Sequence, residues 1–562
     1  MKTGLYSRRS IGYLIVCVAA LSCWSCGHRK KRVEVEHTVV PGKAAFSATE
    51  FAEQLEAALP GTDTAGAAWT GQRLPDLRAA LGLVYQLNNY EPLWLNEKGV
   101  LAYTDTLLSE LDSLQWDGLP AERYQLAALH ELKAKVLTAD APLGDVLRFD
   151  TLCTRAYLQA SRDLLLGVSR PARVDTLWFH SNDSSWTAWR PLAAIVGSSS
   201  YPSLAAYRSR WPAYALMRDA ARHYAQLAQD TAFAALHAQL GLAMNDSLLA
   251  ALLERQMPWL SVAEHDSLPA AQQLVRGAQY YFGQRVSGKL DTATLKKLQL
   301  SPDAVRQLIG LNMERMRWIE QSPTTDYVMV PIPLMELFLV HQEQPGMHMR
   351  VVVGKPSRQT PSLNANMANV VLNPPWGVPP TILKKDVAPG LVKSGGAYLA
   401  KKGLKAYDAK GKMINAGNIN AANYRRFTYR QDPGARNALG EVKFNLPNKW
   451  DIYLHDTPHK EDFPNRNRAK SSGCIRVARP KELAEYILAE MEGRKRFSMD
   501  YIDTVISTRR TRWEILQHKI PVHIVYITAY PDSTNAALRL LDDIYSHDAA
   551  MQAKTASLFK KS

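Results

Sequence analysis

The sequence predicts a multidomain α+β protein with a helical N-terminal domain, a small helical module and a mostly β domain. The chain has 562 residues, of which 46% are hydrophobic, so it can bury two or three cores. Apolar residues recur at helical spacing from 48 to 266, whereas strand-like runs broken by Pro and Gly extend from 326 to 500. The other boundaries are expected at 1–26, 27–47, 267–300, 301–325 and 501–562.

The N-terminus has the pattern of an export signal. Basic residues precede an apolar run at 11–21, which is followed by small residues and cysteines. The run is short for a spanning helix, so 1–26 is expected to be a signal peptide or an anchor. Cys23 or Cys26 is a candidate for lipidation, and the alternative is a plain signal with incidental cysteines. Residues 27–47 lack sustained periodicity and are expected to form a tether.

The helical domain is predicted from repeats such as Phe51, Leu55 and Leu59. A second, small helical module is expected at 267–300, where Asp291 can cap the N-terminus of a helix. A charged helix at 301–325 is expected to link this module to the β domain.

The β domain is predicted to begin with three strands, at Tyr327–Pro331, Leu337–Val340 and Met349–Val353. The strand pattern then lapses at 381–432, which is rich in Lys, Gly, Tyr and Asn. A helix is expected from Pro480 to Gly493, followed by a last buried strand at Val522–Ala529 and a polar tail.

The candidate active site lies in 453–477. Apolar and polar residues alternate from 450 to 455, so a strand there would place Tyr453 and His455 on one face. A turn of small residues precedes Cys474 and frees backbone N–H groups beside its sulfur. A thiol with a pKa near 8.5 needs a nearby base or cation, which His455 and Arg476 can supply. On residue types alone, a buried core thiol and an unrelated histidine are the commoner situation.

The wider pattern resembles the catalytic motif of the YkuD-type L,D-transpeptidases, which is matched here by Tyr453, His455, Ser471, Gly473, Cys474 and Arg476. Ser472 stands where many members have His, and the large Gram-negative members tolerate Ser there. Other stretches are similar to the large YcbB-like members: 83–94 and 117–124 to a scaffold domain, 275–298 to a peptidoglycan-binding repeat, 354–361 and 373–379 to loops at strand ends, and 381–432 to a substrate-capping insertion.

The resemblance implies acyl transfer through a covalent thioester. Cys474 would be the nucleophile and His455 the base, with the Gly473 and Cys474 amides as oxyanion donors and Ser472 in the catalytic loop. The positions implied for substrate binding are Tyr453, Arg476, Ser471, Trp376 and Asn437. The resemblance requires no metal and no organic cofactor.

The implied substrate is a peptidoglycan stem tetrapeptide, cut between its third residue and the terminal D-alanine and then joined to an amine of another stem. Water or a free D-amino acid as acceptor would instead give an L,D-carboxypeptidase or an exchange enzyme. A non-catalytic peptidoglycan-binding scaffold is a further alternative. The implied partners are stem peptides, glycan strands and carbapenem-type β-lactams, and the expected location is the periplasm of a Gram-negative bacterium, with membrane contact through the N-terminus.

The formal net charge of +15 favours anionic partners such as cell-wall polymer or lipid headgroups. Zinc-finger spacing, a Walker loop and base-stacking motifs are missing from the sequence, which argues against nucleic acid as a partner. Of the five cysteines, Cys153 and Cys474 lie beyond the predicted signal. We expect them to stay unpaired, because a disulfide would consume the nucleophile.

Overall fold

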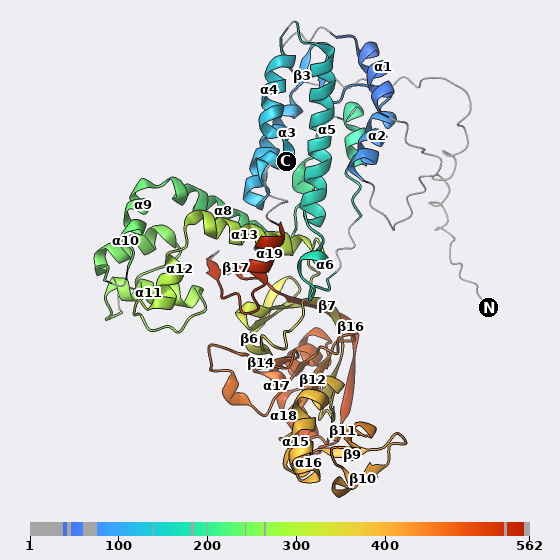
Figure 1. Cartoon of the computed structure of the whole chain (residues 1–562), viewed down its shortest axis with the longest axis vertical. Coiled ribbons are helices and arrows are strands. Elements are labelled where there is room, and N and C mark those ends of the chain that lie inside the picture. The colour runs from blue at the N-terminus through green and yellow to red at the C-terminus, as the bar shows by residue number, and fades with distance from the viewer. Residues whose placement is uncertain are drawn as a thin grey trace, which may run out of the picture.

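The computed structural model describes residues 38–41, 46–59, 76–138, 140–180, 185–198, 200–241, 243–263, 266–532 and 537–555. A helical column stands above a β-rich domain, a second helical lobe projects to one side, and a small subdomain forms the far end (Figure 1). Among the described helices, none combines the length and the apolar character that a membrane span requires. The predicted export signal at 1–26 lies outside the described residues.

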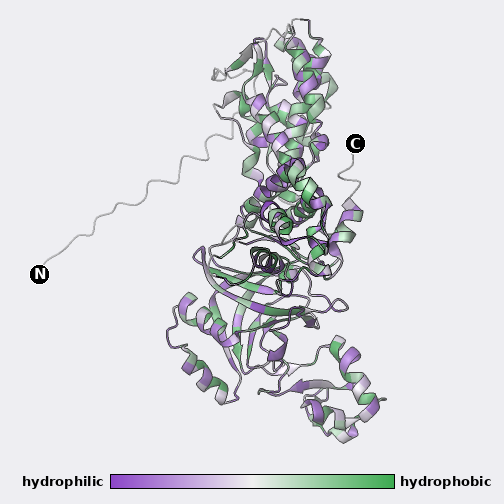
Figure 2. Cartoon of the chain, turned by 90° about the vertical axis from the view of Figure 1, so that its left-hand side faces the viewer, coloured by the Kyte–Doolittle hydropathy of each residue, from purple (hydrophilic) through white to green (hydrophobic). Residues whose placement is uncertain are grey.

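The helical column is built around the long helix α5 (Leu143–Leu166), whose inward residues are fully buried. Hydrophobic and hydrophilic residues interleave along the helices of the column, as amphipathic packing requires (Figure 2). The surrounding elements are α1 (Ala48–Ala58), α2 (Leu77–Leu87), α3 (Tyr103–Ser113), α4 (Leu126–Val136), α6 (Pro171–Val174), α7 (Trp189–Ala193), β1 (Val39–Pro41), β2 (Leu95–Asn96) and β3 (Gly99–Leu101).

The domain begins earlier than the predicted boundary at residue 48. Strand β1 lies within the expected tether, yet it pairs antiparallel with β3. A strand of three residues is too short to produce a periodic pattern, so it could not be predicted from periodicity.

The second helical lobe contains α9 (Thr231–Ala238), α10 (Asp246–Gln256), α11 (Ala270–Tyr281) and α12 (Thr292–Leu298), and α10 packs against both α9 and α11. The lobe therefore starts before the predicted boundary at 267. This start could not be recognised from the sequence, because α9 and α10 have the same helical periodicity as the helices of the column. Asp291 caps α12 as expected, since its carboxylate accepts a hydrogen bond from the Thr294 amide at 2.8 Å.

Helix α13 (Pro302–Arg317) packs along α8 (Pro212–Gln229), where the column, the lobe and the β domain meet (Figure 1). The sequence predicted a charged linker here, but every residue from Leu311 to Arg317 is buried. Its charges are satisfied internally: the Glu314 and Arg317 side chains pair at 2.9 Å with no exposed surface. The helix is therefore part of the core.

The β domain is a nine-stranded sheet in the order β14-β6-β15-β13-β12-β7-β16-β4-β5, and an additional pairing of β5 with β6 curls it into a barrel-like form. Its strands are β4 (Tyr327–Pro331), β5 (Glu336–His341), β6 (Gln344–Gly354), β7 (Leu363–Leu372), β12 (Val442–Asn445), β13 (Leu454–His455), β14 (Ala469–Ser471), β15 (Ile475–Val477) and β16 (Arg512–Val525). Helices α17 (Pro480–Glu485) and α18 (Met499–Ser507) pack against it.

Strand β16 lies in the segment 501–562, which is expected to supply a C-terminal strand and a tail that pack on the catalytic and scaffold domains. The strand lies between β7 and β4 inside the sheet, so the domain needs residues beyond 500 to close. Residues 512–519 carry many polar side chains and an exposed Trp513 and Ile515, and this mixture concealed the first half of the strand.

The stretch at 381–432 is a folded subdomain that we call the cap. Its four-stranded sheet, in the order β10-β9-β11-β8, covers a core of its own that includes Leu391, Leu399 and Tyr429. The elements are β8 (Trp376–Gly377), α14 (Pro380–Ile382), a π-helical turn (Leu383–Val387), α15 (Ala388–Ser394), α16 (Gly396–Lys402), β9 (Lys405–Tyr407), β10 (Met413–Ile414) and β11 (Thr428–Gln431).

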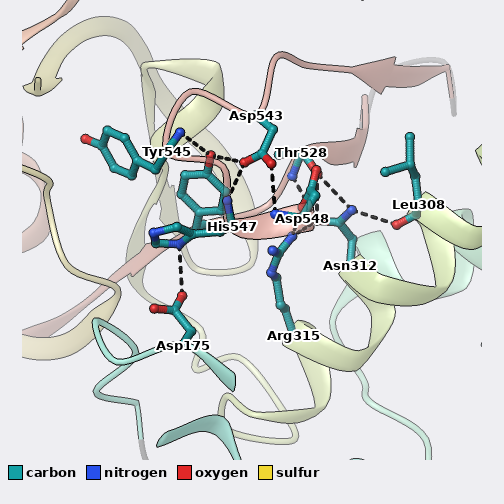
Figure 3. A network of polar contacts seen from close by, with 10 residues as sticks. Asp175, Leu308, Asn312, Arg315, Thr528, Asp543, Tyr545, His547 and Asp548 are labelled. Atoms are coloured by element: carbon teal, nitrogen blue, oxygen red, sulfur yellow. Dashed lines mark hydrogen bonds and ion pairs between the residues drawn. The ribbon is translucent and has the colours of Figure 1, made fainter. Parts of the chain in front are cut away.

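The C-terminal segment returns to the junction through β17 (Ala529–Pro531), β18 (Leu538–Leu540) and α19 (His547–Thr555). Figure 3 shows Asp548 of α19 beside Arg315 and Thr528, with ion-pair and hydrogen-bond distances of 2.5 and 2.7 Å. His547 faces Asp175, which follows α6, at 3.0 Å. The segment thus ties the column, α13 and the barrel together.

Candidate active site

The register of three neighbouring strands builds one face of the candidate site. His455 on β13 is paired with Arg476 on the parallel strand β15 and with Lys443 on the antiparallel strand β12. Paired residues project from the same face of a sheet, so these three side chains form a row. Leu454 and Ile475 point to the opposite face and are fully buried in the core. Tyr453 directly precedes β13 and its ring centroid lies 5.5 Å from that of His455, while Cys474 directly precedes β15.

The half-buried Cys474 thiol lies among polar groups of the strand before it. Its S–H donates to the Asp451 carbonyl oxygen at 3.5 Å. Burial raises the pKa of the thiol, while the polar groups of Tyr453 and the charge of Lys443 lower it; the net shift is upward. The resting group is therefore a thiol, which needs a base before it can attack.

His455 is a neutral base of defined tautomer. Burial, aided by the charges of Arg476 and Lys443, lowers its pKa to about 3. Its Nδ1 lies 2.5 Å from the Asp456 carbonyl oxygen, which can only accept, so Nδ1 carries the proton and Nε2 the lone pair. In the described structure the thiol is hydrogen-bonded to Asp451 and not to His455. Proton transfer to His455 therefore requires the S–H to leave the Asp451 carbonyl oxygen.

The loop before Cys474 is held by side chains. Ser471 donates from Oγ to the Cys474 carbonyl at 2.6 Å and accepts from the Gly473 amide at 3.1 Å. Gly473 has φ +121°, a conformation that favours glycine. Since its amide is engaged by Ser471, it must be released before it can donate to an oxyanion. Ser472 is exposed, and its Oγ accepts from Arg358 at 2.9 Å.

The residues expected to bind substrate have different surroundings. Tyr453 is half-buried; burial and Cys474 raise the pKa of its hydroxyl, and the Trp376 side chain lowers it. Trp376 lies on β8 and packs against the cap core. Arg476 forms an ion pair with Asp462 at 3.0 Å, which anchors the loop between His455 and Ser471.

Asn437 differs from the expectation. It is 2% exposed, its amide donates to the carbonyl oxygens of Pro374 and Asp432, and its Oδ1 accepts from the Leu439 amide. The side chain thus joins two loops at the base of the cap and is not directed at a ligand. The resemblance implied a binding role for Asn437, although buried amides commonly serve backbone groups in this way.

Sequence reasoning missed several residues that border the thiol. Lys443 lies beside His455 in the row described above, and its Nζ is 4.1 Å from the Tyr453 ring centroid. Thr360 donates to the Gly473 carbonyl at 2.7 Å, and its amide donates to the Tyr545 hydroxyl. The signal for Thr360 was present in the stretch 354–361, but Lys443 and Tyr545 reach the site only through pairings far apart in the chain.

The Arg358 guanidinium connects the cap to the nucleophile loop. It binds Ser472 and also forms a two-pronged contact with Asp386 in the π-helical turn of the cap. In the described ranges, no cluster of three His, Cys, Asp or Glu side chains is arranged to hold a metal ion.

Two regions match known protein families. Residues 325–514 match the L,D-transpeptidase catalytic domain family model (YkuD), and residues 79–220 match a scaffold domain model. A Haemophilus influenzae protein named as a proposed L,D-transpeptidase is 30% identical over 296 residues, 52% of this chain and 57% of that protein. The chain therefore spans little more than half the length of this relative.

Solved L,D-transpeptidases also match, but weakly. Mycobacterium tuberculosis L,D-transpeptidase 1 is 11% identical over 37% of this chain and 64% of its own, with a TM-score of 0.16. The Enterococcus faecium L,D-transpeptidase is 10% identical over 47% of this chain and 86% of its own, with a TM-score of 0.18. These scores are too low to bear on the site, so the assignment rests on the two family matches. Residues 325–514 are thus an L,D-transpeptidase catalytic domain of the YkuD family, and residues 79–220 are a scaffold domain.

Proposed function

We propose that this protein cross-links peptidoglycan as an L,D-transpeptidase with Cys474 as nucleophile and His455 as base. The observation that carries the proposal is a row of side chains in the matched catalytic domain. The row holds the neutral His455 imidazole, with its Nε2 lone pair, between the cations Lys443 and Arg476, and Cys474 directly precedes the strand of Arg476. The substrate class follows from the family and is the stem tetrapeptide.

The first step forms a thioester. The thiol proton moves from Cys474 to Nε2 of His455, and the sulfur attacks the carbonyl carbon of the third stem residue. The C–N bond to the terminal D-alanine breaks as its nitrogen takes the proton from the imidazolium. The low pKa of His455 makes that imidazolium a strong acid, which favours proton delivery to the leaving amine.

The second step transfers the acyl group. An amine of another stem gives its proton to the neutral His455 and attacks the thioester carbonyl, and the thiolate leaves and is reprotonated. Backbone amides of the Gly473–Cys474 turn are the candidate oxyanion donors, and removing one such donor typically lowers the rate about a hundred- to a thousandfold. In this scheme the Gly473 amide exchanges Ser471 for the oxyanion.

The cap is proposed to act as the substrate lid. It reaches the site through Trp376, which lowers the pKa of the Tyr453 hydroxyl, and through Arg358, which holds Asp386 beside Ser472. We also propose a periplasmic location with membrane contact through residues 1–26, and glycan strands as partners; fractionation of cells with a Cys23 and Cys26 double-serine variant tests the anchor.

The decisive experiment uses purified mature protein and a disaccharide tetrapeptide, with products followed by mass spectrometry. A dimer that has lost one D-alanine, absent with Cys474→Ala, is the expected result. Tripeptide alone would assign hydrolysis, and D-amino-acid incorporation would assign exchange. No product, with sacculus binding retained by both proteins, would favour a binding scaffold and overturn the proposal. A carbapenem is expected to add its mass to the wild-type protein and not to Cys474→Ala.

A further inference from the structure

Lys443 is a half-buried cation near the centre of the active-site face, and the catalytic motif does not include it. It is paired with His455 across β12 and β13, and its Nζ lies 4.1 Å from the centroid of the Tyr453 ring. Tyr453 also adjoins Cys474, because its carbonyl oxygen accepts from the Ile475 amide at 3.1 Å and Cys474 raises the pKa of its hydroxyl. The ammonium and the sulfur therefore share Tyr453 as a neighbour.

The ammonium has no carboxylate within ion-pair distance in the part of the chain that the structure describes. Acidic residues of the adjoining loop are engaged elsewhere: Asp456 pairs with Lys460, and Asp462 with Arg476. Burial lowers the pKa of Lys443, while the charges of Cys474 and Asp451 raise it, and Asp451 forms no ion pair with it among the described residues. A partly buried ammonium without a paired carboxylate is costly, so an anion that forms beside it during the reaction would stabilise it.

We propose that Lys443 is the positioning residue that stabilises the Cys474 thiolate. The S–H bond breaks, the proton passes to Nε2 of His455, and the electron pair stays on the sulfur, facing the ammonium. The proposal rests on the proposed function only in taking Cys474 as the nucleophile. The cation acts through space and takes up no proton itself.

The charged groups around the thiol change its pKa in opposite directions. Lys443 lowers the thiol pKa, whereas Asp451 raises it. Lys443 also lowers the pKa of His455, after burial and Arg476. Lys443 thus favours the Cys474 thiolate and makes the protonated His455 a stronger acid. The proton that His455 accepts can therefore pass readily to the departing amine. The titratable and charged groups that interact with the thiol are Lys443 on β12, Arg476 on β15, and Asp451 and Tyr453 in the loop before β13; His455 on β13 interacts with Arg476 and Lys443.

The test measures the thiolate directly. Alkylation of Cys474 by iodoacetamide, followed by intact mass across a pH series without substrate, reports the thiolate fraction. The variants are Lys443→Met and Lys443→Gln, which remove the charge, and Lys443→Arg, which keeps it. Lys449→Met is the matched control, because Lys449 also lies over an aromatic ring, Trp450, at 4.6 Å on an exposed part of the chain.

Both neutral variants are expected to alkylate about tenfold more slowly at pH 7, with the midpoint of the pH profile about one unit higher. Lys443→Arg should keep a profile near that of the wild type, and Lys449→Met should be unchanged. Melting curves establish which variants are folded, and two neutral substitutions guard against failure of one. An unchanged alkylation profile in a folded neutral variant would overturn the proposal.

A second result would also overturn it: an increased KM for the tetrapeptide with a normal alkylation profile would make Lys443 a partner for a substrate carboxylate. The alkylation assay contains no peptidoglycan, so its outcome is separate from that of the turnover assay. Wild-type protein that alkylates normally but turns over no tetrapeptide would count against the proposed function alone.

Discussion

Glu314 is the acceptor at the centre of the junction between the scaffold domain and α13, and its replacement is expected to be strongly destabilising. One carboxylate oxygen accepts from the Ser169 amide, the Ser169 hydroxyl and the Trp318 indole at 2.8, 2.9 and 3.2 Å. The other accepts from Arg317 at 2.9 and 3.1 Å, and both side chains of the ion pair are fully buried.

Glu314→Ala leaves the buried Arg317 guanidinium without its carboxylate and Ser169 without its acceptor. Breaking a buried pair from one side costs about 3–5 kcal/mol. The expected loss in free energy of unfolding is of that size, measured by urea denaturation with tryptophan fluorescence, to which Trp318 contributes. The double variant Glu314→Leu with Arg317→Met removes both charges and should lose less than the single variant.

Glu254→Ala, at an exposed position of α10, is the matched control and should change stability by less than about 0.5 kcal/mol. The reasoning fails if Glu314→Ala costs no more than this control. It also fails if the effects of the two charge removals simply add, because a coupled buried pair must show a coupling free energy.

Two further predictions concern pH and the cap. Burial lowers the pKa of His180 to about 3 and that of His523 to about 4, whereas both values are near 6.5 in the unfolded chain. The folded state therefore binds fewer protons than the unfolded state. The stability that is present above pH 6.5 is lost as the pH falls toward 4. The free energy of unfolding from urea titration should be about 2 kcal/mol lower at pH 5 than at pH 7 for each histidine. The variant His523→Leu should show a pH dependence smaller by about 2 kcal/mol, and a pH dependence equal to that of the wild type would refute this account. Arg358→Ala is expected to loosen the cap, which limited proteolysis would reveal as faster cleavage within 381–432. Because Asp386 is 42% exposed, the loss in stability should stay below about 1 kcal/mol. The exchanged pair Arg358→Asp with Asp386→Arg should restore protection, and cleavage of Arg358→Ala at the wild-type rate would contradict the contact's role.

Local features were readable from the sequence because they depend on residues close together in the chain. Alternation from 450 to 455 indicated that Tyr453 and His455 share a face, and the Asp291 cap was visible in the spacing to Thr294. The order of His455, the small-residue turn and Cys474 was sufficient to indicate the family that the domain match confirms.

Only the tertiary structure decided which residues distant in the sequence lie beside the catalytic motif. The register between β12 and β13 brings Lys443 beside His455, and the return of the C-terminal segment brings Tyr545 to Thr360. Packing between distant segments likewise placed β16 in the barrel and separated the second helical lobe from the helical column. Periodicity of two or 3.6 residues records which face of an element is apolar, but it does not record which partner covers that face. The pairing of strands and its register depend on packing of the whole chain. The charged groups around the Cys474 thiol are therefore brought together only when the chain is folded.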